Sequence, residues 1–158
     1  MKTAPHILLE SPGQPEIVSL IEELDAYQMP LYPEESHHGI DIDALSASNV
    51  LFAVARNEHG EAVACGALAL QSTYGELKRM FTKPAFRGQG LARTLLAFLE
   101  AEAQKRGCTH FALETGYRQN EAISLYERCG YSRCGPFGDY VSDPNSVFLE
   151  KPYRSLGS

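Results

Sequence analysis

The sequence lacks the features of several broad classes of protein. Its 158 residues contain 14 Lys and Arg against 20 Asp and Glu, which gives a formal net charge of −6 at pH 7. Nucleic-acid-binding domains normally carry a basic surface, so this balance argues against a nucleic-acid partner. The sequence also has no apolar run long enough to span a membrane, and no charged and then apolar leader at its N-terminus. We therefore expect a cytoplasmic protein that does not associate with membranes.

Cysteine is sparse and irregularly spaced. The four cysteines are Cys65, Cys108, Cys129 and Cys134, and no two of them form a C-x-x-C pair. This spacing predicts reduced thiols rather than a disulfide framework or a zinc site. A cysteine that carries an acyl group would need a nearby base, and the sequence indicates none for Cys65 or Cys108.

The length and the hydrophobic pattern predict one α/β domain that covers residues 1–158. Alternating apolar residues predict strands, and apolar residues at helical spacing predict helices. The predicted strands are His6–Glu10, Leu51–Arg56, Ala62–Leu70, Tyr74–Thr82, Thr109–Thr115, Tyr131–Cys134 and Ser146–Glu150. The predicted helices are Pro15–Ala26, Asp41–Ser48, Leu91–Arg106 and Asn120–Arg128. This order favours one mixed sheet with helices on its faces.

The segment from Arg87 to Ala92, Arg-Gly-Gln-Gly-Leu-Ala, lies between a predicted strand and a predicted helix. The free N–H groups and the positive end of the dipole at a helix N-terminus attract anions, and glycine lets a ligand approach the backbone. Arg87 adds a permanent positive charge. The pattern predicts a phosphate site here. The alternative is an ordinary turn between a strand and a helix that binds no ligand.

The helix after this turn has a clear amphipathic pattern. Its apolar stripe consists of Leu91, Leu95, Leu96, Leu99 and Ala103. The polar residues Arg93, Thr94, Glu100 and Gln104 are expected away from that stripe.

Two motifs together resemble the GCN5-related N-acetyltransferases, the acetyl-CoA-dependent GNAT family. The segment Arg87–Ala92 fits the family's cofactor signature, Arg/Gln-x-x-Gly-x-Gly/Ala, with alanine in the last position. Asn120 opens a later helix, Tyr126 follows within it, and Gly130-Tyr131 comes after it, as in the family. The chain is similar, more loosely, to the bacterial small-molecule subgroup. The resemblance implies the GNAT fold, a single mixed and mostly antiparallel sheet in which strands four and five splay apart.

The resemblance implies acetyl-CoA as cofactor, with its pantetheine arm in the splay. Backbone groups of Met80, Phe81 and Thr82 would bind that arm. The pyrophosphate would lie on the backbone amides of Arg87, Gly88, Gln89, Gly90, Leu91 and Ala92. Arg93 and Lys83 would add outer positive charges. Asn120 would contact the pantetheine, unless it only caps its helix.

The resemblance also implies direct acetyl transfer to a primary amine of a small molecule in a ternary complex. Tyr126 would protonate the departing thiolate, unless it is an ordinary core tyrosine. The acceptor ammonium must lose a proton before it attacks. Glu76 is the first candidate base and Glu114 the second, and bound water without a dedicated residue is the third option.

The acceptor side is less defined by sequence. Residues of the segment Tyr27–Gly39 would line the acceptor mouth, unless this is only a solvated loop: Tyr27, Tyr32, Glu34, Glu35, His37 and His38. A metal site is not expected there, because adjacent histidines rarely bind one ion. Lys78 or Arg79 would suit an acceptor with a carboxylate such as an amino acid, unless they face solvent or phosphate. Strict alternation puts Lys78 with Glu76 and Met80, and Arg79 with Leu77 and Phe81, but a bulge would change this.

Two other functions stay open at this point. One is acetylation of a protein N-terminus or lysine, and the other is acyl-CoA sensing without catalysis. The segments Tyr27–Gly39 and Gly135–Pro144 are long enough to narrow the site, which favours a small acceptor over a peptide. Family members often form dimers, so the resemblance allows a homodimer.

Overall fold

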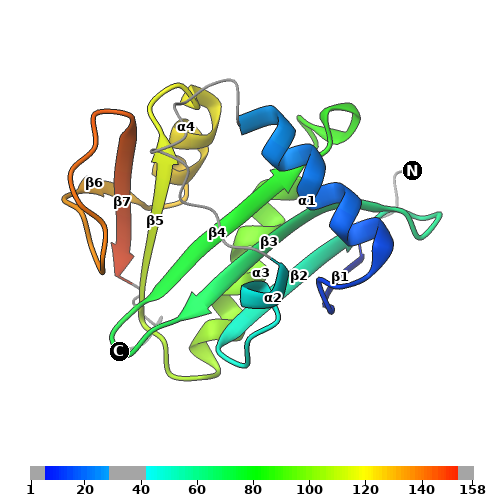
Figure 1. The fold of residues 1–158 in the computed structure, drawn as a ribbon, viewed down its shortest axis with the longest axis horizontal. Coiled ribbons are helices and arrows are strands. Elements are labelled where there is room, and N and C mark those ends of the chain that lie inside the picture. Colours follow the sequence, from blue (N-terminus) through cyan, green and yellow to red (C-terminus); the bar gives the residue numbers. More distant parts are fainter. Residues whose placement is uncertain (1–5, 29–41, 153–158) are drawn as a thin grey trace.

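The computed structural model describes residues 6–28 and 42–152, which form one seven-stranded sheet in the order β1-β2-β3-β4-β5-β7-β6 (Figure 1). The strands are β1 His6–Leu9, β2 Val50–Arg56, β3 Ala62–Leu70, β4 Gly75–Thr82, β5 His110–Gly116, β6 Ser132–Cys134 and β7 Ser146–Pro152. Neighbouring strands are antiparallel except for the parallel pair β4 and β5. The predicted mixed, mostly antiparallel sheet is therefore confirmed.

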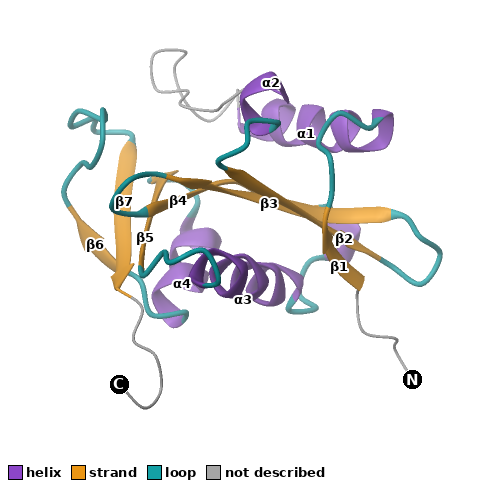
Figure 2. Ribbon diagram, turned by 90° about the horizontal axis from the view of Figure 1, so that it is seen from below, coloured by secondary structure: helices purple, strands orange, loops and turns teal. Residues whose placement is uncertain are grey.

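Helices cover both faces of the sheet, as Figure 2 shows. The helices α1 (Pro15–Gln28) and α2 (Ile42–Leu45) lie on one face, and α3 (Leu91–Gln104) and α4 (Asn120–Arg128) lie on the other. Because side chains alternate along a strand, β2 contributes to two apolar cores. Leu51 and Ala53 pack in the core that includes α3, whereas Phe52 and Val54 pack in the core that includes α1.

Two short elements differ from the sequence expectation. The helix α2 has four residues instead of the predicted eight, and Asp41 lies outside the described residues. After Leu45 the chain leaves α-helical geometry, since the amide of Ala47 bonds to the carbonyl of Ala44, three residues back, at 3.2 Å. A 3-10 turn at Pro84–Phe86, which the sequence analysis did not predict, leads from β4 toward α3.

The strands β4 and β5 separate after a short paired stretch. They pair only from Gly75 to Leu77 and from Phe111 to Leu113. Beyond these residues the two strands diverge, toward the top of Figure 1. The predicted splay of strands four and five is confirmed, and it opens the sheet between its two faces.

A bulge in β4 lies beside this splay. Cys65 of β3 pairs with Phe81 and Ala67 pairs with Lys78, so Gly66 alone faces Arg79 and Met80. Arg79 has a φ of 57°, in the left-handed region that non-glycine residues seldom adopt. Extra residues of this kind turn the following side chains to the other face of a strand.

The bulge overturns strict alternation along β4. Phe81 packs in the core that includes α1, while Leu77 and Met80 pack in the core that includes α3. Leu77 and Phe81 were expected on one face and lie on opposite faces. Lys78 pairs with Ala67, which packs in the core that includes α1. Because paired residues point to the same side of a sheet, Lys78 lies on the face covered by α1, here called the α1 face.

The sequence pattern predicted that Glu100 lies on the polar, exposed side of α3, and this prediction is wrong. Only 7% of its surface is exposed. The hydroxyl of Tyr131 donates to its Oε2 at 2.7 Å, and Nζ of Lys151 donates to its Oε1 at 3.0 Å. A helical pattern predicts that a charged residue is exposed. Glu100 can be buried because Tyr131 and Lys151, from distant segments of the chain, bind its carboxylate.

Candidate functional site

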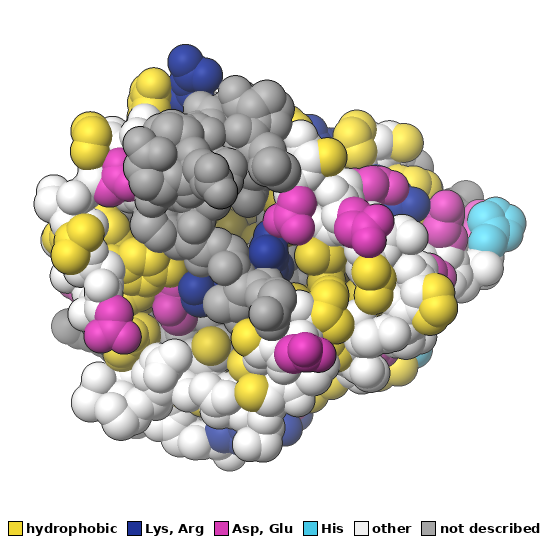
Figure 3. Space-filling view, viewed as in Figure 1, with side chains coloured by type: hydrophobic (Ala, Val, Ile, Leu, Met, Phe, Trp, Pro, Cys, Tyr) yellow, Lys and Arg dark blue, Asp and Glu magenta, His cyan; other side chains and the backbone are white. Residues whose placement is uncertain are grey.

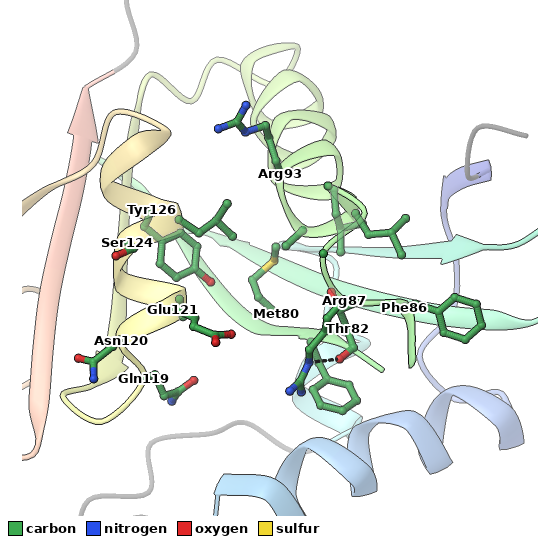
Figure 4. Close-up of a pocket in the computed structure, with 18 of the residues that line it drawn as sticks. Met80, Thr82, Phe86, Arg87, Arg93, Gln119, Asn120, Glu121, Ser124 and Tyr126 are labelled. Carbon is green, nitrogen blue, oxygen red and sulfur yellow. Dashed lines mark hydrogen bonds between the residues drawn. The ribbon is translucent and has the colours of Figure 1, made fainter. Parts of the chain in front are cut away.

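A cavity of about 1070 Å³ lies between the end of β4, the N-terminus of α3 and helix α4 (Figure 4). Apart from Gln89 and Lys83, every residue that was predicted to bind cofactor lines this cavity: Met80, Phe81, Thr82, Arg87, Gly88, Gly90, Leu91, Ala92, Arg93 and Asn120. The structure thus gathers residues from a strand, a turn and two helices around one space. The volume is that of a site for a large organic ligand.

The turn before α3 exposes backbone donors to this cavity. Gly88 and Gly90 have φ values of 80° and 78°, which favour glycine. A Cβ on either residue would meet no other atom within 4 Å, so the absence of side chains leaves the surface of the turn bare. Among the described residues, the amides from Gly88 to Arg93 have no partner, and the first bond is from Thr94 N to Gly90 O at 3.1 Å. The turn can therefore hold an anion.

Arg87 reaches back from this turn toward α1. Its Nε donates to the carbonyl of Thr82 at 3.0 Å. Its guanidinium lies 5.3 Å from the ring centre of Tyr27 and 5.8 Å from that of Phe81, within cation–π range. Tyr27 also lines this cavity, whereas it was expected at the acceptor mouth.

Lys83, expected as an outer charge for phosphate, is not among the residues that line this cavity. Its Nζ lies 4.0 Å from a carboxylate oxygen of Glu23 and 3.9 Å from one of Glu61. Sequence proximity to the turn did not reveal these partners, because both come from other elements. Arg93, in contrast, lines the cavity on the first turn of α3.

Tyr126 points from α4 into the cavity, with its hydroxyl toward the space beside Met80 (Figure 4). Only 7% of its surface is exposed, and its ring meets that of Tyr131 edge-on at 5.9 Å. Burial raises the pKa of Tyr126 above its ordinary value. The phenol is therefore protonated at neutral pH and can donate a hydrogen bond or a proton into the cavity.

Asn120 is the first residue of α4, and Gln119 occupies the N-cap position without a side-chain capping bond. The alternative in which Asn120 only caps the helix is thus wrong. Residues of α4 and its preceding loop that the sequence analysis did not single out also line the cavity: Arg118, Gln119, Glu121, Ala122, Ser124, Leu125 and Arg128. A helical pattern around Asn120 and Tyr126 could have indicated some of them.

A second polar cluster lies on the α1 face of the sheet, at the splay. Tyr140 donates from its hydroxyl to Oε2 of Glu76 at 2.6 Å. Nζ of Lys78 donates to the Tyr140 hydroxyl at 3.1 Å and lies 3.3 Å from Glu76 Oε2. The sequence analysis predicted Glu76 and Lys78 but missed Tyr140, for which the only signal was its place in the segment Gly135–Pro144.

Burial and the hydrogen-bonded carboxylate of Glu76 together raise the pKa of Tyr140 above its ordinary value. The negative charge of Glu76 would repel a phenolate, and the hydrogen bond stabilises the protonated phenol. At neutral pH Tyr140 is therefore a neutral phenol that is hydrogen-bonded to both Glu76 and Lys78.

The other predicted acceptor residues have partners of their own. Arg79 forms an ion pair with Asp25 of α1. Ser146 donates to Oε2 of Glu114 at 2.7 Å, on the neighbouring strand β5. Figure 3 shows basic and acidic side chains together near the centre of this face. Five further predicted residues lie outside the described residues: Tyr32, Glu34, Glu35, His37 and His38.

Two negative findings concern the described ranges 6–28 and 42–152. Within them, no group of three or more His, Cys, Asp or Glu side chains could hold a metal ion. Within the same ranges, no helix has the length and apolar character that a membrane span requires.

Comparison with known proteins gives consistent matches. Residues 17–131 match the family described as the acetyltransferase (GNAT) family. The chain is 47% identical over 148 residues to an IAA acetyltransferase of Azospirillum brasilense, covering 92% of this chain and 96% of that protein. It is 36% identical over 149 residues to YsnE, an uncharacterised N-acetyltransferase of Bacillus subtilis (strain 168), covering 92% and 98%.

Solved structures extend this similarity. A Klebsiella pneumoniae protein described as an acyl-CoA N-acyltransferase superposes with a TM-score of 0.81 at 40% identity, over 95% of this chain and 98% of its own. The PaiA N-acetyltransferase of Thermoplasma acidophilum, solved with coenzyme A, gives a TM-score of 0.73 at 18% identity, over 96% and 100%. The second similarity concerns the fold alone.

Proposed function

Because the chain belongs to the GNAT family of acetyl-CoA-dependent N-acetyltransferases, we propose that it transfers acetyl to a primary amine of a small molecule, directly and in a ternary complex. The observation that carries this proposal is a pair of sites at one splay. Tyr126, which lines the cavity, belongs to the core on the α3 face, and the Glu76–Tyr140 cluster lies on the α1 face. A cofactor and an acceptor that bind on opposite faces can meet between β4 and β5.

The cavity fits acetyl-CoA, which supplies an activated acetyl thioester when bound. The unpaired amides from Gly88 to Arg93 suit its pyrophosphate, since amides at a helix N-terminus bind phosphate oxygens. The edge of β4 beyond Leu77 is not paired with β5, so backbone groups of Met80, Phe81 and Thr82 are positioned to bind the pantetheine amides. Asn120 and Arg93 would complete the site at α4 and α3.

Two proton movements complete the proposed reaction. Tyr126, neutral and directed into the cavity, donates a proton from its Oη to the departing thiolate. Glu76 is the proposed base for the acceptor ammonium, with Glu114 on the next strand as the second candidate. Lys78, Arg79 and the segment with Tyr32, Glu34, His37 and His38 are proposed to shape the acceptor site.

The proposed acceptor is small because Tyr140, from the loop between β6 and β7, already lies against β4. An acceptor with its own carboxylate would have to compete for Lys78 and Arg79, which contact Glu76 and Asp25. The name of the Azospirillum relative makes IAA a compound to include in any test. A single domain, a cytoplasmic location and a homodimer remain proposals.

The test is a panel assay that follows release of free thiol from acetyl-CoA. Amino acids, other small amines, IAA, an N-terminal peptide and a lysine peptide serve as acceptors. We expect turnover with at least one small amine and calorimetric binding of acetyl-CoA. Turnover with peptides alone would support a protein acetyltransferase instead. Binding without turnover on any acceptor would support an acyl-CoA sensor, and neither binding nor turnover would reject the proposal.

A further inference from the structure

Glu76 is poorly placed to meet an acceptor amine directly. Only 5% of its surface is exposed. Its Oε2 already accepts a hydrogen bond from Tyr140 and lies 3.3 Å from Nζ of Lys78. Its backbone pairs with Ala112 within the closed part of the sheet, one residue before the splay begins. An amine that arrives in the splay would therefore meet another group before it meets this carboxylate.

That group is Tyr140. Its ring is fixed by edge contacts with Phe137 at 5.1 Å and Phe148 at 5.5 Å. Its hydroxyl contacts Glu76 and Lys78 of β4.

The neighbours of Tyr140 show that its hydroxyl lies at the splay. Glu76 and Lys78 of β4 contact the hydroxyl directly, and the negative charge of Glu114 on β5 helps to raise its pKa. Tyr74, in the segment before β4, is a neutral phenol near Tyr140, and Asp139 of the loop lies near Tyr74. Since Lys78 and Glu114 each follow closely on the last paired residues of β4 and β5, the hydroxyl lies where the two strands part, on the α1 face. Tyr126 lies on the other face.

We propose that Tyr140 is the residue that contacts the acceptor amine, and that Glu76 receives the proton through it. This inference rests on the proposed function. One proton passes from the acceptor ammonium to Oη of Tyr140, while the phenol's own proton passes to Oε2 of Glu76. The amine keeps the electron pair of the broken N–H bond and can attack. The phenol is unchanged, Glu76 becomes a carboxylic acid, and no further reactant is needed.

Lys78 supports this relay in two ways. Its hydrogen bond at 3.1 Å fixes the position of the phenol oxygen beside Glu76. Its positive charge beside the acceptor disfavours a second cation, which makes the ammonium easier to deprotonate. A relay is needed because a primary amine with a pKa of about 10 is almost entirely protonated at neutral pH.

The test compares Tyr140→Phe with the wild type over a range of pH. The variant keeps the ring and its edge contacts but loses Oη. We expect kcat/KM to fall on the order of a hundredfold at pH 7. The loss should shrink as pH approaches the acceptor's own pKa, because free amine needs no base. Calorimetric affinity for acetyl-CoA should not change, which also shows that the variant is folded.

The matched control is Tyr74→Phe. Tyr74 packs edge-on against Phe137 at 5.5 Å in the same aromatic cluster, and its removed hydroxyl has no assigned role in the relay. We expect the wild-type rate and pH profile from this variant. An equal, equally pH-dependent loss in Tyr74→Phe would overturn the relay, because the effect would belong to the cluster as a whole.

A double-mutant comparison tests whether Tyr140 and Glu76 act as one unit. The variant E76Q should show the same pH-dependent loss, and the double variant should lose no more than the worse single variant. A loss in Tyr140→Phe that is constant with pH, additive losses, or a wild-type rate in Tyr140→Phe would each overturn the relay. Failure of the proposed function is recognised separately, because the wild type itself would then release no thiol with any acceptor.

Discussion

At the scale of single residues, two tyrosines, one buried and one half-buried, lie on opposite faces of the sheet beside the same splay. Tyr126 comes from α4 and Tyr140 from the loop before β7. In both, burial raises the pKa and keeps the phenol neutral. A neutral phenol can donate a proton in one step and recover it in another, so both are suited to proton transfer at neutral pH.

The first prediction concerns Tyr126. Replacement by Phe should lower kcat by on the order of a hundredfold, because the departing thiolate loses its proton donor. Calorimetric affinity for acetyl-CoA should stay close to that of the wild type. Tyr117→Phe, at an exposed tyrosine, is the control and should keep full activity. An unchanged rate in Tyr126→Phe would show that Tyr126 is only a core residue.

The second prediction concerns the buried ion pair of Glu100. Lys151→Met would leave this carboxylate with the Tyr131 hydroxyl but without its cation, at a side chain only 9% exposed. We expect the free energy of unfolding to fall by about 3 kcal/mol, measured by urea denaturation. Lys105→Met breaks an exposed pair with Glu102 and should cost less than about 1 kcal/mol. Equal losses would show that the Glu100 pair contributes nothing special.

At the scale of elements, irregular backbone positions form the site. The bulge at Arg79 and Met80 turns Met80 toward the cavity and Phe81 toward the α1-side core. The turn with Gly88 and Gly90 presents bare amides at the start of α3. The regular strands and helices surround the cavity, and the bulge and the glycine turn determine which side chains and backbone amides face it.

The third prediction tests the turn with a matched pair of glycines. Gly90 and Gly60 both have a φ of 78°, and a Cβ on either would meet no atom within 4 Å. Replacement of either by Ala should therefore cost a similar stability, about 1 kcal/mol. Only Gly90→Ala should weaken acetyl-CoA, at least about tenfold, because its methyl group would hinder the pyrophosphate. Equal calorimetric affinities in the two variants would contradict the phosphate assignment.

At the scale of the whole molecule, the sheet separates two chemical environments. The α3 and α4 side carries Tyr126 and the glycine turn, and the α1 side carries the polar cluster of Glu76, Lys78 and Tyr140. The cavity itself extends through the splay to Leu24 and Tyr27 of α1. The splay connects the two sides where the backbone pairing of β4 and β5 ends. This arrangement is the basis of the proposal that cofactor and acceptor meet at the splay.

The fourth prediction concerns alkaline pH, where buried neutral groups lose their protons on unfolding. Burial raises the pKa of Cys65 from 9.0 to about 12. The protonated thiol therefore contributes its full stability below pH 9, and this contribution is lost as pH rises toward 12. For Cys65 the free energy of unfolding should fall by about 1.4 kcal/mol per pH unit above 9. The buried tyrosines, whose pKa values are also raised, add to this fall at higher pH.

Urea denaturation at pH 8 and pH 10.5 measures this effect. Cys65→Ala removes the thiol and should show a fall between these pH values that is smaller by about 2 kcal/mol. Identical falls in the two proteins would show that ionisation of Cys65 is not linked to unfolding.

Much of the fold follows from local pattern. The bounds of β3 and α4 are those expected from the sequence, and most other elements differ by one or two residues. The largest error is at α2, which ends at Leu45 rather than at Ser48. Glu100 was misplaced because its partners, Tyr131 and Lys151, are distant in the chain.

The sequence by itself determined the order of the elements, the glycine turn before α3 and the pair Asn120 and Tyr126, because each depends on neighbouring residues or a short motif. Only the tertiary structure decided which side chains meet at the splay. The bulge in β4 reverses the facing of later residues, and a loop some sixty residues away brings Tyr140 to Glu76. Such contacts depend on backbone register and chain return, which local periodicity does not encode.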